Sequence, residues 1–252
     1  MAKVLGTAAV LVVALRMGWG SEAATALLYA GHSALYTPGS DGTYSQNYQD
    51  LWVVALAKAN GWDSPGAGGF FLDVGAFNGI WCSNTVLLEE VLDWNGVCVE
   101  PYPRDFEGRR CALVQKAIGS TAGKIVSMTG SMQTRTVVEE AGGDIETTSF
   151  EALLGEFRPD GGLVHFISLD VEGFELAALS TFPWERWTVG AFIVESPSPE
   201  TKRLLFDHGY RQRSAVAAGP TVDGYFVRDE FWPADGVPAR DSRVHPTFSW
   251  GC

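Results

Sequence analysis

Basic residues are scarce in this chain of 252 residues. Lys and Arg number 18 against 30 Asp and Glu, which leaves a formal net charge of −12 at pH 7. A protein with this charge repels phosphate backbones and anionic lipid surfaces, and no local cluster of Lys and Arg offsets that repulsion. We therefore expect no nucleic-acid partner.

Cysteine is also scarce, and its spacing lacks the patterns of a metal site. The four cysteines, Cys82, Cys98, Cys111 and Cys252, form no CxxC pair and no Cys/His array. The first three fall in or near expected core segments, where cysteine commonly serves as a small buried hydrophobe. We expect these cysteines to be buried free thiols.

The N-terminal apolar run is too short to span a bilayer. Residues 4–15 follow Lys3, whereas a spanning helix needs about 20 apolar residues. This run and the small residues at 21–26 are typical of a secretory signal peptide. We expect residues 1–30 to direct the chain to the secretory pathway. A signal anchor, an organelle-targeting segment and an ordinary helix are the alternatives, and a membrane partner is expected only for an uncleaved anchor.

The remaining chain has the composition of one globular domain. Hydrophobic residues make up 46% and charged residues 19%, so there is enough apolar bulk for a single large core. We expect a linker over residues 31–43, a domain over 44–230 and a loosely ordered tail over 231–252, which is rich in Pro, Asp and Arg.

Hydrophobic patterning alternates between short apolar strands and helices. Strands are expected at residues 70–74, 97–100, 112–118, 164–169, 191–194 and 224–227. Helices are expected at residues 49–59, 85–92, 150–157, 174–179 and 202–208. This alternation predicts an α/β fold with a doubly wound, mostly parallel Rossmann-like sheet and helices on both faces. Residues 125–149 lack a period and are expected to form a variable insert, a flap or edge hairpin over the site.

Acidic residues end four of the expected strands, namely Asp73, Glu100, Asp170 and Glu195. Ligands of open parallel sheets bind beyond the carboxyl ends of the strands. We therefore expect the chemistry of this protein to lie along that one edge.

The segment after the first strand indicates a nucleoside-type ligand. Residues 70–79 read FFLDVGAFNG, so Asp73 leads into a turn with Gly75 and Gly79, and glycine lets a ligand approach the backbone. The second glycine of the dinucleotide fingerprint G-x-G-x-x-G is missing, and no Walker loop is present. Glu100, at the end of the next strand, could accept both hydroxyls of a ribose. Together, the glycine turn and Glu100 favour a binding site for a nucleoside without a pyrophosphate over the alternative that the turn is only an ordinary tight turn.

Several segments, in this order along the chain, resemble the FkbM-type methyltransferase domain. They are YSQ and QD within residues 44–50, FFLDVGAFNG, SNT at 83–85, WNGVCVEPYP at 94–103, AIGS at 117–120 and ISLDVEGFE at 167–175. The resemblance covers residues 44–227. The last segment is the most specific, because its run of acids after an apolar strand has no common structural explanation. The resemblance implies a class I methyltransferase fold that uses S-adenosyl-L-methionine, usually to methylate a hydroxyl oxygen of a small metabolite or sugar.

The resemblance also implies roles for individual residues. The implied cofactor-binding residues are Asp73, Gly75, Ala76, Asn78, Gly79 and Glu100. Asp170 and Glu172 would face the transferred methyl group. The family often has a smaller or polar residue where Phe77 stands, so we expect the cofactor loop to be packed differently here.

The chemistry of methyl transfer agrees with these roles. In-line displacement at a sulfonium methyl requires the protein to align the acceptor and exclude water. A hydroxyl acceptor also loses a proton, which a nearby carboxylate could take. Asp170 and Glu172 are the candidates, with Glu175 behind them, although Glu172 and Glu175 could instead only stabilise a helix N-terminus. His165 is expected to be structural.

Three polar residues near the first helix have two interpretations. Gln46, Gln49 and Asp50 could fold over the cofactor pocket, or they could cap the helix and face solvent. Asp170 and Glu172 could coordinate a magnesium ion, but the further carboxylates that such a site needs are not identifiable from the sequence. No metal is therefore predicted.

Two other classes of function stay open. A protein with this fold could be a non-catalytic adaptor in the secretory pathway, but the intact set of strand-end acids and Gly75 favours an enzyme. A nicotinamide-dependent oxidoreductase would also use strand-end acids. The missing pyrophosphate glycine and the absence of a Tyr-x-x-x-Lys pair count against that alternative. The expected partner is a small-molecule or glycan hydroxyl acceptor.

Overall fold

The computed structural model describes residues 43–64, 66–104, 106–130, 136–138, 143–218 and 221–237. The predicted signal segment, and the predicted linker apart from Thr43, lie outside the described residues. Among the residues that are described, no helix is long and apolar enough to cross a membrane.

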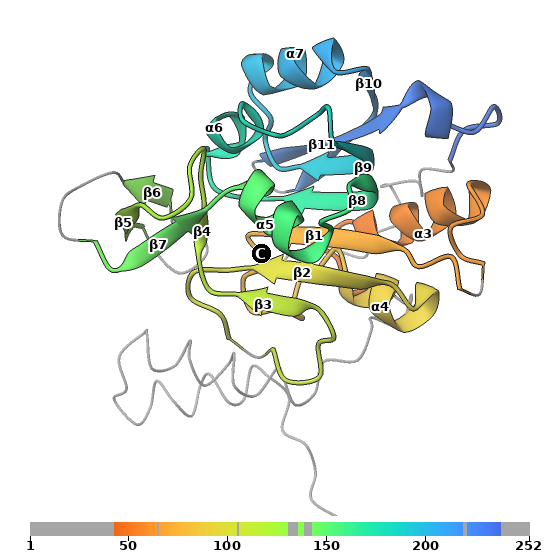
Figure 1. The fold of residues 1–252 in the computed structure, drawn as a ribbon. Coiled ribbons are helices and arrows are strands. Elements are labelled where there is room, and N and C mark those ends of the chain that lie inside the picture. The colour runs from red at the N-terminus through yellow and green to blue at the C-terminus, as the bar shows by residue number, and fades with distance from the viewer. Residues whose placement is uncertain are drawn as a thin grey trace, which may run out of the picture.

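A seven-stranded sheet forms the centre of the molecule, with the order β10-β11-β9-β8-β1-β2-β3 (Figure 1). Its strands are β1 (Phe70–Val74), β2 (Asn95–Val99), β3 (Ala112–Val114), β8 (Gly162–Leu169), β9 (Trp187–Val194), β10 (Tyr210–Ala218) and β11 (Thr221–Arg228). The strands from β9 to β3 are parallel, whereas β11 is antiparallel to β9 and β10 is antiparallel to β11. The predicted fold class is confirmed.

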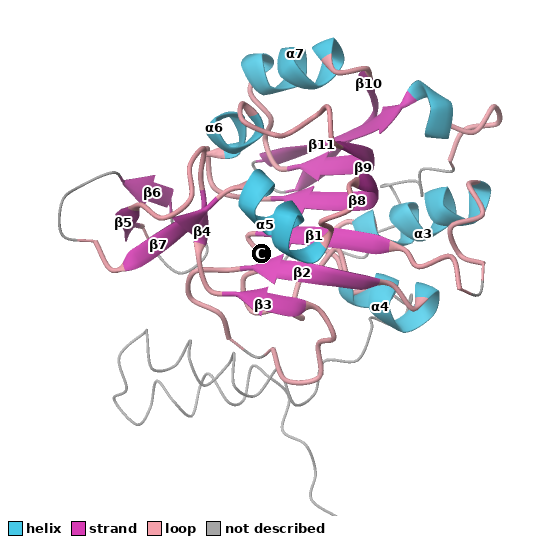
Figure 2. Ribbon diagram, in the orientation of Figure 1, coloured by secondary structure: helices cyan, strands magenta, loops and turns pink. Residues whose placement is uncertain are grey.

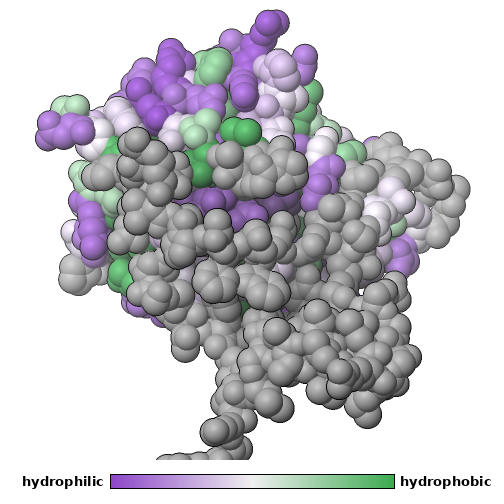
Figure 3. Space-filling model, turned by 180° about the vertical axis from the view of Figure 1, so that it is seen from behind, coloured by the Kyte–Doolittle hydropathy of each residue, from purple (hydrophilic) through white to green (hydrophobic). Residues whose placement is uncertain are grey.

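Helices cover both faces of this sheet (Figure 2). They are α3 (Gln49–Ala59), α4 (Val86–Leu92), α5 (Phe150–Phe157), α6 (Glu175–Leu179) and α7 (Pro199–Asp207), followed by the 3-10 turn η1 (Asp229–Phe231). Alternate residues of β1 point to the two faces. Leu72 belongs to the hydrophobic cluster that contains residues of α5, α6 and α7, whereas Phe71 belongs to the cluster that contains residues of α3 and α4. Seen from behind, the upper part of the surface is mostly hydrophilic (Figure 3).

The parallel strands β1, β2, β8 and β9 end side by side at the same edge of the sheet. Val74 of β1 pairs with Val99 of β2 and Leu169 of β8, and Leu169 pairs with Val194 of β9. The chain runs outward from β1 in both directions, to β2 on one side and to β8 on the other, so the ligand-binding switch point of such folds lies here.

The expected insert, residues 125–149, forms β5 to β7, which join β4 in a second, small sheet beyond the carboxyl ends of the parallel strands (Figure 1). The strands of this sheet are β4 (Ala117–Ile118), β5 (Ile125–Thr129), β6 (Thr136–Val138) and β7 (Ile145–Thr148), in the order β4-β7-β5-β6. The single strand predicted over residues 112–118 is therefore two strands in two sheets. The strand β10 was not predicted, because an edge strand with the polar sequence YRQRSAVAA has no apolar run.

The prediction of free cysteines is wrong. Cys98 of β2 forms a disulfide with Cys111, and Cys82 is also disulfide-bonded. Cys111 immediately precedes Ala112, which pairs with Val97 in the parallel β2–β3 ladder. The pairing is set by this strand alignment, which residue spacing alone does not reveal.

The start of the predicted loose tail is packed against the domain. The Trp232 ring lies 6.5 Å from the Trp52 ring, the Phe231 ring lies 5.3 Å from the Trp62 ring, and Val237 is buried. The packed domain therefore continues to at least Val237, and residues 238–252 lie outside the described residues.

His165 has the structural environment that we expected. Its Nδ1 accepts a hydrogen bond of 3.1 Å from the Phe70 backbone N–H, and its ring lies 5.2 Å from the rings of both Trp62 and Trp94. Burial, with a smaller effect of Arg158, lowers the pKa of His165 from 6.5 to about 4. The buried imidazole is therefore neutral at pH 7.

We predict that His165 makes the fold sensitive to acid. Because its pKa is lower in the folded than in the unfolded chain, its contribution to stability is complete above pH 6.5 and is lost as the pH falls toward 4. This loss is about 3 kcal/mol at most, at 1.36 kcal/mol per pKa unit. His165→Asn keeps a hydrogen-bond acceptor but does not titrate, so urea unfolding between pH 7 and 4 should show a smaller loss for the variant. Equal losses in the two proteins would contradict this account.

Candidate functional site

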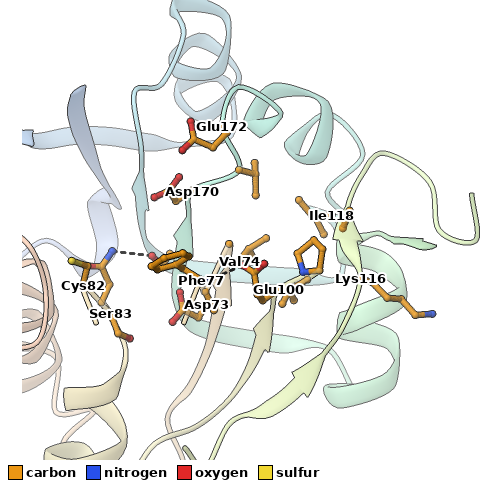
Figure 4. A pocket seen from close by; sticks show the side chains of 18 of the residues that line it. Asp73, Val74, Phe77, Cys82, Ser83, Glu100, Lys116, Ile118, Asp170 and Glu172 are labelled. Carbon is orange, nitrogen blue, oxygen red and sulfur yellow. Dashed lines mark hydrogen bonds between the residues drawn. The ribbon is translucent and has the colours of Figure 1, made fainter. Parts of the chain in front are cut away.

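A hollow opens at the carboxyl ends of β1, β2 and β8 (Figure 4). It contains about 1030 Å³ of empty space, counting the side that is open to solvent. The turn after β1, Glu100 after β2, Ile118 of β4, Met128 of β5 and Asp170 after β8 all line it. The small sheet therefore contributes to the wall of the site through β4 and β5.

The turn after β1 approaches β8 so closely that residue 75 has to be glycine. A Cβ atom on Gly75 would lie 1.7 Å from the Asp170 carbonyl oxygen, and the φ angle of 84° lies in the left-handed region. The N–H groups of Gly75 and Ala76 both donate to the Val99 carbonyl, at 2.9 and 3.2 Å. The turn is thus tied to β2 and lies against the residue that follows β8.

The structure divides the predicted cofactor-binding residues into two groups. Those that line the hollow are Asp73, Gly75, Ala76 and Glu100. Asn78 and Gly79 do not line it. The buried Asn78 side chain accepts hydrogen bonds from the N–H groups of Ile80 and Trp81, at 3.1 and 2.7 Å, so it shapes the turn.

Glu100 holds two loops of the hollow together. Its carboxylate oxygens accept hydrogen bonds from the backbone N–H groups of Phe77, at 2.8 Å, and Tyr102, at 2.9 Å. Phe77 adopts a left-handed φ of 49°, and its ring lines the hollow at 6.0 Å from the Trp81 ring. Because each carboxylate oxygen has two lone pairs, Glu100 can still accept from a ligand hydroxyl.

Asp73 is anchored by a buried network on the α4 side. Its Oδ2 accepts a hydrogen bond of 2.5 Å from the Thr85 hydroxyl, which in turn accepts one of 2.8 Å from Arg109. Arg109 forms an almost fully buried ion pair of 3.0 Å with Glu89 and also donates to the Gly79 carbonyl. Burial raises the pKa of Asp73, and the Arg109 charge opposes that rise. Sequence reasoning missed Arg109, because it lies in an expected loop without a recognisable motif.

Three carboxylates meet where β8 and β9 end. Oxygen atoms of Asp170, Glu172 and Glu195 all lie within 4.8 Å of one another. Burial and the neighbouring Glu195 raise the pKa of Asp170 well above its usual range. Burial, with a further contribution from Glu195, raises the pKa of Glu172 to about 7. Figure 4 shows Asp170 and Glu172 on the same side of the hollow.

The two glutamates with a structural alternative behave differently. Glu175 is buried, and its Oε1 accepts hydrogen bonds from the N–H groups of Val171 and Gly173, at 3.2 and 3.0 Å. The Glu175 carboxylate therefore stabilises the loop before α6. Glu172 lines the hollow and has a left-handed φ of 53°, a conformation that is uncommon for a residue with a side chain.

A second, smaller hollow adjoins the first. It contains about 400 Å³ of empty space and shares Cys82, Asn84, Ser168 and Asp170 with the larger one. The other residues that line it are Gln46, Gln49, Leu169, Ile193, Glu195 and Asp223. Asn84 donates a hydrogen bond of 3.0 Å to the Ser168 hydroxyl. Ligands in the two hollows would meet beside Asp170.

The three polar residues near α3 therefore have different roles. Gln46 and Gln49 line the smaller hollow, and Gln49 donates to Asp223 at 2.9 Å. Asp50 is fully buried and accepts from Thr43 and from the Tyr44 N–H, so it fixes the segment before α3. Asp223 was missed, because it lies in the antiparallel β11, outside the strand-end pattern.

This arrangement, with a glycine turn after β1 and an acid after β2, defines the class of the protein as a Rossmann-like α/β fold with its candidate site at the carboxyl ends of the strands. The family model described as the methyltransferase FkbM domain matches residues 73–211, more than half of the chain. The chain belongs to the FkbM methyltransferase family. No curated protein matches its sequence closely enough to count as a relative.

Several solved structures of methyltransferases have a distant likeness to the chain. A precorrin-6y C5,15-methyltransferase from Geobacter metallireducens is 15% identical, with a TM-score of 0.40, over 71% of this chain and 87% of its own. An O-methyltransferase of neocarzinostatin biosynthesis, solved with S-adenosyl-L-homocysteine and 1,4-dihydroxy-2-naphthoic acid, is 13% identical. Its TM-score is 0.34, over 88% of this chain and 68% of its own.

We predict that Gly75→Ala destabilises the protein far more than Gly209→Ala. Both residues have φ near 85°, so both variants suffer the left-handed backbone penalty of about 1–2 kcal/mol. Only at residue 75 does the new Cβ also collide with backbone, since a Cβ added to Gly209 would have no atom within 4 Å. We expect Gly75→Ala to lose at least about 2 kcal/mol more in the free energy of unfolding, measured by denaturant titration. Equal losses would show that β8 can move away from the turn.

Proposed function

We propose that this protein transfers a methyl group from S-adenosyl-L-methionine to a hydroxyl oxygen of a small-molecule or glycan acceptor. The observation that carries the proposal is the pair of hollows that share Asp170 and Asn84. One hollow has the glycine turn and Glu100 for a nucleoside cofactor. The other is lined mostly by amides and carboxylates, which suit the hydroxyl groups of a polar acceptor.

The residues of the larger hollow fit the cofactor. Glu100 would accept the ribose hydroxyls, the backbone of Gly75 and Ala76 would lie against the ligand, and the Phe77 ring offers an apolar surface for a flat base. S-adenosyl-L-methionine supplies the methyl group on a positively charged sulfur. Asp170 and Glu172 place negative charge on the same hollow, so they would attract a cationic ligand.

The acidic side of the site would take the proton that the acceptor releases. The acceptor oxygen forms a bond to the methyl carbon as the carbon–sulfur bond breaks, and the electron pair of that bond stays on sulfur. The hydroxyl proton passes to the carboxylate of Asp170 or Glu172 and from there to solvent. The protein contributes alignment by enclosing the two ligands in adjoining hollows.

The adaptor alternative has no support in the described residues. Asp73, Glu100, Asp170 and Glu172 all line the larger hollow, so the residues that an enzyme would need are in place together. We keep the secretory pathway as the proposed compartment. The disulfide-bonded Cys82, Cys98 and Cys111 support it, because disulfides persist mainly in oxidising compartments.

The first test is isothermal titration of the full chain with S-adenosyl-L-homocysteine. We expect micromolar binding that Glu100→Gln weakens at least about tenfold, because one charged acceptor for the ribose is lost. The matched control is Glu200→Gln, the same change at an exposed site on α7, which should bind like the wild type. Absence of binding to folded wild-type protein would overturn the proposed function.

The second test separates methyl transfer from cofactor binding. We predict that Asp170→Asn still binds S-adenosyl-L-homocysteine but transfers a radiolabelled methyl group to hydroxyl acceptors about 100-fold more slowly or worse, as expected for loss of a proton acceptor. A screen of polyols, sugars and hydroxy acids would supply the acceptor. Wild-type activity in Asp170→Asn would remove that residue from the reaction.

A further inference from the structure

The carboxylates beside the two hollows repel one another. Asp170, Glu172 and Glu195 have oxygen atoms within 4.8 Å of each other, and the charges that act on Asp170 come from these two glutamates and Asp223. Like charges at this separation in a partly buried site are costly unless a proton or a cation lies between them.

A buried acceptor atom points to a cation rather than to protons alone. Asp223 is buried, with an exposed fraction of 5%, and it lines the smaller hollow together with Asp170 and Glu195. Its Oδ2 accepts from Gln49, but its Oδ1 has no hydrogen-bond partner. The buried Oδ1 of Asn84, on the wall shared by the hollows, also lacks a partner. Buried acceptors without donors are rare in native proteins.

The strand pairing explains why these oxygens gather. Asp170 and Glu195 directly follow Leu169 and Val194, which are paired in the parallel β8–β9 ladder. Asp223 directly precedes Gly224, which pairs with Val194 in the antiparallel β9–β11 ladder. The start of β11 therefore lies beside the ends of β8 and β9, and three strands contribute one acid each.

We propose that Asp170, Glu172 and Glu195 bind a hard divalent cation of the magnesium or calcium type, with Asp223 completing its oxygen environment. The donors are all oxygen atoms, which suits these ions better than zinc or copper. The other cluster of suitable atoms in the described residues, Glu89 with Cys98 and Cys111, is unsuited because both sulfur atoms are in the disulfide.

The position of this cation predicts the chemistry of the acceptor, a step that rests on the proposed function. Asp170 lies on the wall between the two hollows, so an ion bound there would contact an acceptor in the smaller one. Free coordination positions would take two neighbouring oxygens of a vicinal diol or an α-hydroxy acid. The ion would also make the reacting hydroxyl more acidic, so that its proton leaves more readily to solvent.

Cation binding can be measured without cofactor or acceptor. The full chain is titrated calorimetrically with MgCl2, CaCl2 and MnCl2, and its melting temperature is followed with and without each salt. We expect saturable binding and a higher melting temperature for the wild type. Glu195→Gln and Asp223→Asn should each weaken binding at least about tenfold, because each removes one negative oxygen from the site.

The variants also report on the repulsion itself. In the absence of cation, Glu195→Gln should melt at the same temperature as the wild type or higher, since it relieves the crowding of charge. Glu200→Gln, the same substitution at an exposed site, should bind cations like the wild type. Equal cation binding by the wild type and Glu195→Gln, or no saturable binding by the wild type, would overturn the cation site.

The two proposals fail separately. Binding of S-adenosyl-L-homocysteine without cation binding would remove only the cation site. Cation binding without binding of S-adenosyl-L-homocysteine would remove the proposed methyl transfer and leave the cation site standing.

Discussion

The contact between the Gly75 backbone and the Asp170 carbonyl sets the geometry of the whole site. It brings the turn after β1 against the loop after β8, while the Gly75 and Asp170 N–H groups donate to the carbonyls of Val99 and Val74. Three parallel strands are thereby held level at their carboxyl ends. The hollow lies where the chain leaves these strands in opposite directions.

Charge is distributed unevenly around this contact. On the α4 side, the buried acids Asp73 and Glu89 lie near the buried Arg109, which compensates them. On the β9 side, Asp170 has only acidic neighbours acting on it. In the first arrangement each buried acid has a positive charge nearby, and removal of Arg109 would leave buried carboxylates without that partner. In the second arrangement, carboxylates repel one another at the place where a positively charged cofactor or ion would lie. Such a concentration of like charge is typical of a ligand-binding site and is unfavourable for stability.

The loop between β2 and β3 supports the glycine turn from behind. The disulfide joins Cys98 to Cys111, and the carboxylate of Glu89 accepts hydrogen bonds from the N–H groups of Arg110 and Cys111. These contacts position Arg109, which donates to the Gly79 carbonyl. Gly79 therefore contributes through its backbone, at the end of the turn away from the hollow. Ordering this polar loop costs conformational entropy. The disulfide and the buried ion pair between Arg109 and Glu89 offset that cost.

The alternation of strands and helices, the α3 span of residues 49–59 and the family could all be predicted from sequence patterns, because they depend on local periodicity and on motifs in a fixed order. These patterns also placed Glu100, Asp170 and Glu195 at strand ends, since a parallel sheet aligns those ends. The disulfide, the role of Arg109 and the contact of Gln49 with Asp223, which are 174 residues apart, became visible only in the folded chain. Those contacts arise from the pairing of strands and the packing of helices on them, and no local pattern records which distant residues such pairing brings together.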